Sequence, residues 1–177
     1  MGFLLFGPRF HQRTQKEGDQ LALIISKGTH ADIPALVEFN AAMAVETENK
    51  ELDIEILTAG VKALLDRPEH GFYLVARQDY RPIGSLMITY EWSDWRNGLF
   101  WWIQSVYVHP EARRQGVYRQ LYERVKQMAV AARDVIGYRL YVEASNHTAR
   151  RVYENLGMEP TTYRLYEAEI DLSIEQN

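Results

Sequence analysis

The chain has 177 residues, of which 46% are hydrophobic and 25% charged, the size and composition of one globular domain. It contains no cysteine, which excludes disulfide scaffolds, thiolate metal sites and cysteine nucleophiles. The formal charge of −4 argues against a general nucleic-acid-binding protein, and no apolar run approaches the roughly 20 residues that a membrane span needs. We therefore expect a cytoplasmic protein that uses neither nucleic acid nor membrane as a partner.

The first part of the chain predicts an extension followed by one strand and two helices. Residues 3–6 are a short apolar run and residues 7–20 are polar without a regular pattern, so we expect a mobile N-terminal extension over 1–20 and a folded domain over 21–177. The predicted elements that follow are a strand at Leu21–Ser26, a helix from Asp32 to about Ala44, a polar loop at Glu46–Glu51 and a helix from Asp53 to Arg67.

The rest of the chain predicts a meander of strands and then a strand–helix–strand unit. The predicted elements are strands at Phe72–Ala76, Ile83–Tyr90 and Leu99–Val108, a helix at Val117–Ala132, a strand at Tyr138–Glu143, a short helix at about Asn146–Leu156 and a final strand at Thr162–Ile170. The helix at Val117–Ala132 predicts a crossover between two parallel strands, and the other connections favour antiparallel pairing. This order of elements is typical of an α+β domain.

A basic turn between a strand and a helix is the most informative stretch of the sequence. It runs from Val106 to Tyr118 and contains two adjacent arginines, Arg113 and Arg114, followed by Gly116. A helix N-terminus exposes unpaired N–H groups, and a glycine there lets the backbone approach a phosphate closely. Anion binding is therefore one interpretation, and an ordinary helix with a basic lead-in is the other.

A second constellation lies on the short helix near the end of the chain. Asn146, Ala149 and Tyr153 are spaced i, i+3 and i+7, so they share one helix face. Asn146 could cap the helix or bind a ligand amide, and the Tyr153 phenol could donate a proton to a leaving group. A capped amphipathic helix with a tyrosine at the rim of the core explains the same pattern.

Together these two stretches resemble the GNAT superfamily of acyl-CoA-dependent N-acyltransferases. The family pattern V-x-x-x-x-R-x-x-G-x-G/A is matched at the strand Val106–Val108, at Arg113 and at Gly116, with Tyr118 in place of the usual Gly or Ala. The family pattern N-x-x-A-x-x-x-Y-E-x-x-G-[FM] is matched at Asn146, Ala149, Tyr153, Glu154, Gly157 and Met158. Two such motifs, in order and within the same predicted architecture, are more specific than either alone.

The resemblance implies a single GNAT-type α+β domain. Its sheet would be mixed and mostly antiparallel, with splayed parallel central strands flanked by helices. It implies acetyl-CoA as cosubstrate, with no metal. The residues that the resemblance assigns to acetyl-CoA binding are Val106, Tyr107, Val108, Arg113, Arg114, Gln115, Gly116, Val117, Tyr118 and Asn146. An amine would attack the thioester directly, and Tyr153 would protonate the departing thiolate.

The general base and the acceptor are less determined by the sequence. Glu91 is the candidate base, with Glu46, Glu48 and Asp94 as alternatives, and a water chain could also accept the amine proton. The acceptor side would contain Glu46, Glu48, Trp92 and Asp94. Carboxylates with aromatic walls suit a small cationic amine through ion pairing and cation–π contact. A catalytically silent acyl-CoA-binding sensor or interaction module remains the alternative. A homodimer is also open, because a surface for it could come from four closely spaced tryptophans, Trp92, Trp95, Trp101 and Trp102.

Overall fold

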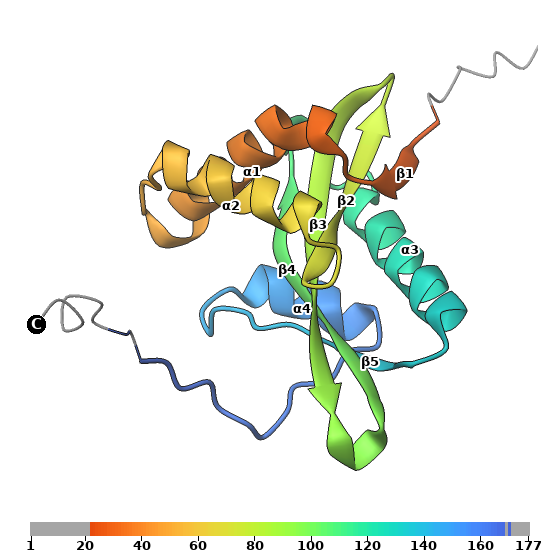
Figure 1. Ribbon diagram of the computed structural model, residues 1–177. Coiled ribbons are helices and arrows are strands. Elements are labelled where there is room, and N and C mark those ends of the chain that lie inside the picture. Colours follow the sequence, from red (N-terminus) through yellow and green to blue (C-terminus); the bar gives the residue numbers. More distant parts are fainter. Residues whose placement is uncertain (1–21, 169, 171–177) are drawn as a thin grey trace, which may run out of the picture. The chain divides into compact units, whose positions relative to one another are not determined.

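The computed structural model describes residues 22–168 and residue 170 (Figure 1). The chain forms two compact units that divide between Arg139 and Leu140. The first unit contains a sheet with three α-helices, and the second contains one α-helix. The predicted extension over 1–20 lies outside the described residues.

The first unit is built on a five-stranded mixed sheet in the order β1-β2-β3-β4-β5. Its strands are β1 (Ile24–Lys27), β2 (Gly71–Gln78), β3 (Arg81–Ser93), β4 (Gly98–Val108) and β5 (Val135–Arg139). All neighbouring pairs are antiparallel except β4 and β5, which are parallel. The α+β class and the single parallel pair predicted from the sequence are therefore confirmed.

Helices cover both faces of this sheet, so consecutive residues of β2 are buried on both sides. The pair α1 (Ile33–Glu48) and α2 (Ile54–Asp66) lies on one face, and α3 (Val117–Ala132) lies on the other (Figure 1). Tyr73 and Val75 of β2 pack with Leu36 of α1 and Val61 of α2 in one core cluster. Apolar residues at helical spacing thus meet the alternating residues of the strands.

A buried ion pair fixes the start of α1 to the sheet. Asp32 ends the 3-10 turn η1 (His30–Asp32) and is 5% exposed, and Arg77 of β2 donates to its Oδ1. Burial alone would raise the pKa of Asp32, but hydrogen bonds from the Thr29 backbone N–H and from Arg77 together hold it below its ordinary value. The carboxylate is therefore charged and paired at neutral pH.

The second unit contains α4 (His147–Asn155), close to the predicted helix at Asn146–Leu156. Asn146 is its N-cap, and Gly157 follows the helix with a left-handed φ of 84°. The predicted strand at Thr162–Ile170 is wrong, because residues 162–168 and 170 form no strand and their apolar side chains are exposed. A strand is stable only when it is paired, and composition alone does not provide a partner.

Two element boundaries also differ from the predictions. The predicted loop at Glu46–Glu51 is wrong at its start, since α1 continues to Glu48 and ends at Asn49 in the left-handed conformation. Glutamate is a good helix former and asparagine suits a left-handed C-terminal position. The predicted strand Tyr138–Glu143 is displaced, because β5 begins at Val135, where it pairs with Leu99.

Candidate functional site

A bulge interrupts β4 before its last residues. Ser85 of β3 pairs with Tyr107 and Met87 pairs with Gln104, so β4 has one residue more than β3 between these registers. Ser105 lies in this bulge with a φ of 47°, in the left-handed region. A bulge leaves its extra residue outside the regular ladder. The predicted cofactor strand Val106–Val108 begins directly after it.

One edge of this part of β4 has no paired strand among the described residues. The parallel ladder between β4 and β5 ends at Trp102 and Arg139, whereas β4 continues to Val108. On its other side, Val108 still pairs with Gly84 of β3. The parallel ladder therefore has no rung beyond Trp102, where β5 itself ends, and the predicted splay of the two strands stays a prediction. A strand edge of this kind can hydrogen-bond an extended ligand as if it were another strand.

The N-terminus of α3 has the properties of an anion site. Gly116 is its N-cap with a φ of 78°, and no side chain caps the helix or adds an acidic group to its first turn. A Cβ built on Gly116 would meet no atom within 4 Å, so the space beside the backbone is open. The first N–H groups of a helix lack helical acceptors. Val117, Tyr118 and Arg119 thus offer donors suited to a pyrophosphate, which the preceding Arg114 complements in charge.

The Arg113 side chain is fixed by contacts with other residues of the protein. Its Nε donates to the Val108 carbonyl at 2.9 Å, and its guanidinium forms an ion pair with Glu46 of α1 at 2.6 Å. The guanidinium also lies 5.7 Å from the centre of the Tyr107 ring, which itself stacks on Phe39. Arg113 therefore connects the end of β4 to α1 and shapes the loop before Gly116.

The neighbouring predicted cofactor residues also have defined positions. Gln115 donates to the Glu111 carbonyl at 2.7 Å, which closes the loop on the 3-10 turn η3 (Pro110–Ala112). The Tyr118 ring lies 6.4 Å from the ring of Tyr122, one helical turn later. Tyr118 is partly buried, so its side chain packs along α3 and leaves the backbone N–H for a ligand.

Glu91 is the centre of a polar and aromatic cluster on β3, β4 and β5. Its carboxylate accepts hydrogen bonds from Trp102 and from Arg139. Burial tends to raise the pKa of Glu91, but the hydrogen bonds from Arg139 and Trp102 lower it below the ordinary value. Sequence reasoning missed Arg139, because the register that brings it beside Glu91 cannot be read from composition.

The predicted acceptor residues lie in two groups rather than one. Glu46 is near the C-terminal end of β4 through its ion pair with Arg113, whose Nε binds Val108. Trp92 pairs with Leu99 at the other end, and Asp94 is in the 3-10 turn η2 (Asp94–Arg96). Val108 lies nine positions after Leu99, which is about 30 Å along the strand.

Within this arrangement, Glu48 is exposed near the C-terminus of α1, and Trp92 is 57% exposed.

The second unit contains the other two predicted site residues. The Asn146 side chain accepts a hydrogen bond from the Ala149 backbone N–H at 3.0 Å, so it caps α4 as the spacing suggested. Burial raises the pKa of the Tyr153 phenol above its ordinary value of 10. The phenol is therefore protonated at neutral pH, as a proton donor must be.

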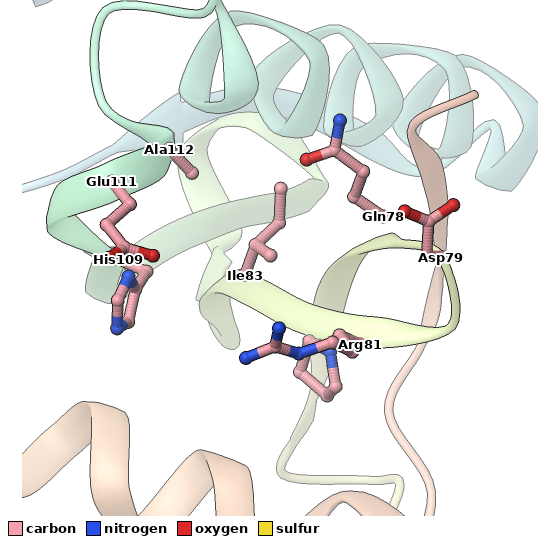
Figure 2. Close-up of a pocket in the computed structure, with 8 residues that line it drawn as sticks. Gln78, Asp79, Arg81, Ile83, His109, Glu111 and Ala112 are labelled. Atoms are coloured by element: carbon pink, nitrogen blue, oxygen red, sulfur yellow. The ribbon is translucent and has the colours of Figure 1, made fainter. Parts of the chain in front are cut away.

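A hollow of about 170 Å³ lies between the β2–β3 turn and η3 (Figure 2). Ile83 lies in its centre, with His109 and Glu111 on one side and Gln78 and Asp79 on the other (Figure 2). Both charge signs line it, so it offers no clear preference for an anion or a cation. Over residues 22–168 and 170, no group of three or more His, Asp or Glu side chains could hold a metal, and no helix is long and apolar enough to span a membrane.

The comparisons with known proteins decide the family. The family model described as Acetyltransferase (GNAT) family matches residues 34–158, more than half of the chain. The chain belongs to the GNAT acetyltransferase family. The match extends across both units, from α1 to Met158, and includes both motifs. The GNAT resemblance drawn from the two motifs is confirmed.

Solved structures agree with this assignment. The chain is 43% identical to a possible acetyltransferase from Clostridium difficile 630, with a TM-score of 0.80, and the alignment covers 84% of this chain and 98% of that one. A predicted acetyltransferase from Clostridium acetobutylicum, solved with acetyl-CoA, shares the fold at 20% identity and a TM-score of 0.68, covering 88% of this chain and 100% of that one.

A ribosomal-protein-alanine N-acetyltransferase from Brucella melitensis biovar Abortus 2308 shares the fold at 17% identity and a TM-score of 0.69, covering 85% and 100% of the two chains. A comparison with curated proteins finds no match. Family membership implies acetyl transfer from acetyl-CoA and leaves the acceptor undetermined.

Proposed function

We propose that this chain is an N-acetyltransferase that moves an acetyl group from acetyl-CoA to a primary amine by direct attack. The observation that carries this proposal is the N-terminus of α3. No side chain caps its first N–H groups, and Gly116 leaves open space beside them. The family match over residues 34–158 supports the same reading. A catalytically silent acyl-CoA sensor is the second candidate, and it shares the binding site without the turnover.

The chain's own residues supply binding and orientation. Acetyl-CoA brings an acetyl group that is already activated as a thioester. The N–H groups of Val117 and Tyr118 would hold its pyrophosphate, with Gly116 allowing close approach and Arg114 adding charge. The edge of Val106–Val108 that pairs with no strand among the described residues would hydrogen-bond the extended pantetheine arm as an added strand. A backbone N–H beside the Ser105 bulge would stabilise negative charge on the thioester oxygen.

Proton transfers complete the reaction. The amine nitrogen forms the new C–N bond, the C–S bond breaks, and the sulfur takes a proton from Tyr153, which regains one from solvent. The raised pKa of Tyr153 keeps this proton in place at neutral pH. Glu91 as base stays a prediction. A carboxylate with a lowered pKa is a weak base, so its contacts favour an anchoring role, with water accepting the amine proton.

A small cationic amine is the acceptor class that we propose. Glu46 and Glu91 are each paired with an arginine, so they add little net negative charge. A small amine can contact only one end of β4, so the support comes from the exposed carboxylate of Glu48, on the same helix as Glu46. Asp94 and the exposed ring of Trp92 lie about 30 Å away, at the other end of the strand. The predicted cytoplasmic location and the homodimer remain predictions.

Calorimetry and turnover together test the proposed function. Native protein should bind acetyl-CoA, and a panel of primary amines should include one that releases CoA thiol in equal amount to acetylated amine. Binding without transfer to any amine would favour the sensor. No binding would remove both candidates.

A further inference from the structure

The sheet carries a second cluster of side chains, apart from the proposed acetyl-CoA and acceptor sites. It lies where the parallel ladder between β4 and β5 stops, at the pair Trp102 and Arg139. Arg139 is the last residue of β5. Whatever fixes the position of Arg139 also fixes the last rung of the parallel ladder.

The Arg139 side chain crosses β4 to reach β3. Its guanidinium lies 3.7 Å from the centre of the Phe100 ring and forms an ion pair with Glu91. The second Glu91 oxygen accepts the indole N–H of Trp102, which pairs with Arg139 in the ladder. We call Glu91, Phe100, Trp102 and Arg139 the three-strand clasp.

The backbone of β5 is adapted to this stacking. Gly137 pairs with Phe100, and a Cβ on Gly137 would lie 2.7 Å from the Phe100 ring. Glycine therefore gives the ring room to lie beside β5, where its face receives the guanidinium. A guanidinium that stacks on an aromatic face and is also paired with a carboxylate is held in one orientation, whereas a solvated arginine moves freely.

We propose that Arg139 is a positioning residue, which through the three-strand clasp holds β5 against β4 at the last rung of the parallel ladder. The inference rests on the proposed function, because the part of β4 beyond this rung is where the acyl arm would pair. A displacement of about 1 Å in a reacting group can cost up to about 10²-fold in rate. The clasp would thus affect how the thioester is aligned, whereas the N-terminus of α3 would supply most of the binding energy for acetyl-CoA.

A double-variant cycle separates this role from that of a general base. Arg139→Gln and Glu91→Gln should each lower kcat by roughly 10- to 100-fold. The acetyl-CoA Kd should change by less than about threefold, because the pyrophosphate donors on α3 are untouched. The double variant should be no slower than the slower single variant, since both remove the same clasp. Arg139→Lys should recover part of the loss.

A base would give a different pattern. If Glu91 accepts the amine proton, Glu91→Gln should have a severely lowered kcat. Arg139→Gln should then keep a near-native kcat, because loss of the arginine leaves the Glu91 carboxylate free and raises its pKa. Lys62→Gln, which removes an exposed ion pair with Asp66 on α2, is the matched control and should keep native kcat. All rates are measured well below the melting temperature of each variant, so that reduced stability alone does not lower them.

Amide hydrogen exchange tests the clasp without any turnover. In protein free of acetyl-CoA, the backbone N–H groups of Val135–Arg139 should exchange roughly fivefold faster in Arg139→Gln than in native protein. If native protein transfers no acetyl group, the proposed function fails and the exchange result still decides the clasp. Native exchange rates in Arg139→Gln, or native kcat in an active enzyme, would overturn the proposal.

Discussion

Replacing Gly116 by alanine perturbs the backbone and the ligand space at one point. Gly116 has a φ of 78°, a region that costs an L-residue about 1–2 kcal/mol. The melting temperature should therefore fall by roughly 2–8 °C for a chain of this size. The added methyl group meets no protein atom within 4 Å, so it enters the space that the pyrophosphate would occupy.

The effect on acetyl-CoA binding should exceed the effect on folding. A hydrogen bond from a backbone N–H to a charged group is worth about 1.5–3 kcal/mol, so loss of one such bond weakens binding by roughly 10- to 150-fold. Calorimetry at a temperature well below melting measures this directly. Gly60→Ala is the control, since Gly60 lies on α2 with equally open surroundings and should leave the affinity unchanged. A folded Gly116→Ala protein whose Kd is within twofold of native would refute the assignment of the pyrophosphate site.

Three further predictions concern the proton donor, the acceptor side and the fold. Tyr153→Phe should lower kcat by roughly 10²- to 10⁴-fold with little change in acetyl-CoA affinity, and steady-state kinetics with near-native kcat would remove its role as acid. Glu48→Gln should raise KM for a diamine by about two- to fivefold, whereas Asp94→Asn, at the other end of β4, should leave it unchanged; an unchanged KM in Glu48→Gln would contradict a cationic acceptor at this end. Asp32→Asn should cost about 1–3 kcal/mol at pH 7, because the partly buried Arg77 loses its charged partner while keeping its hydrogen bond to Ser26. Since the folded-state pKa of Asp32 lies below 3.8, this deficit in thermal unfolding is full above about pH 4 and shrinks as the pH falls through the lowered pKa; a deficit independent of pH would oppose the ion-pair account.

Local sequence signals predicted the features that local physics determines. The Gly116 turn and the Asn146 cap depend on residues within one helical turn, and both lie where the spacing placed them. The parallel pair followed from the length of the connection that carries α3. These features required no knowledge of which strands meet.

Features that depend on register could not be predicted. The bulge at Ser105 has no glycine to indicate it, and only the pairing of β3 with β4 reveals it. The ion pair between Glu46 and Arg113 joins residues 67 positions apart, and the contact of Arg139 with Glu91 spans 48. A carboxylate that the sequence predicts to be a base or an acceptor ligand can thus be neutralised by an arginine far away in the sequence.

Acetyl transfer itself is the central claim, and it is measured most directly by mass spectrometry of amines incubated with acetyl-CoA and native protein. We predict that at least one cationic primary amine gains one acetyl group while an equal amount of free CoA thiol appears, and that Tyr153→Phe slows both signals together. Saturable binding of acetyl-CoA with no acetylated amine and no thiol release above the uncatalysed rate would contradict the account.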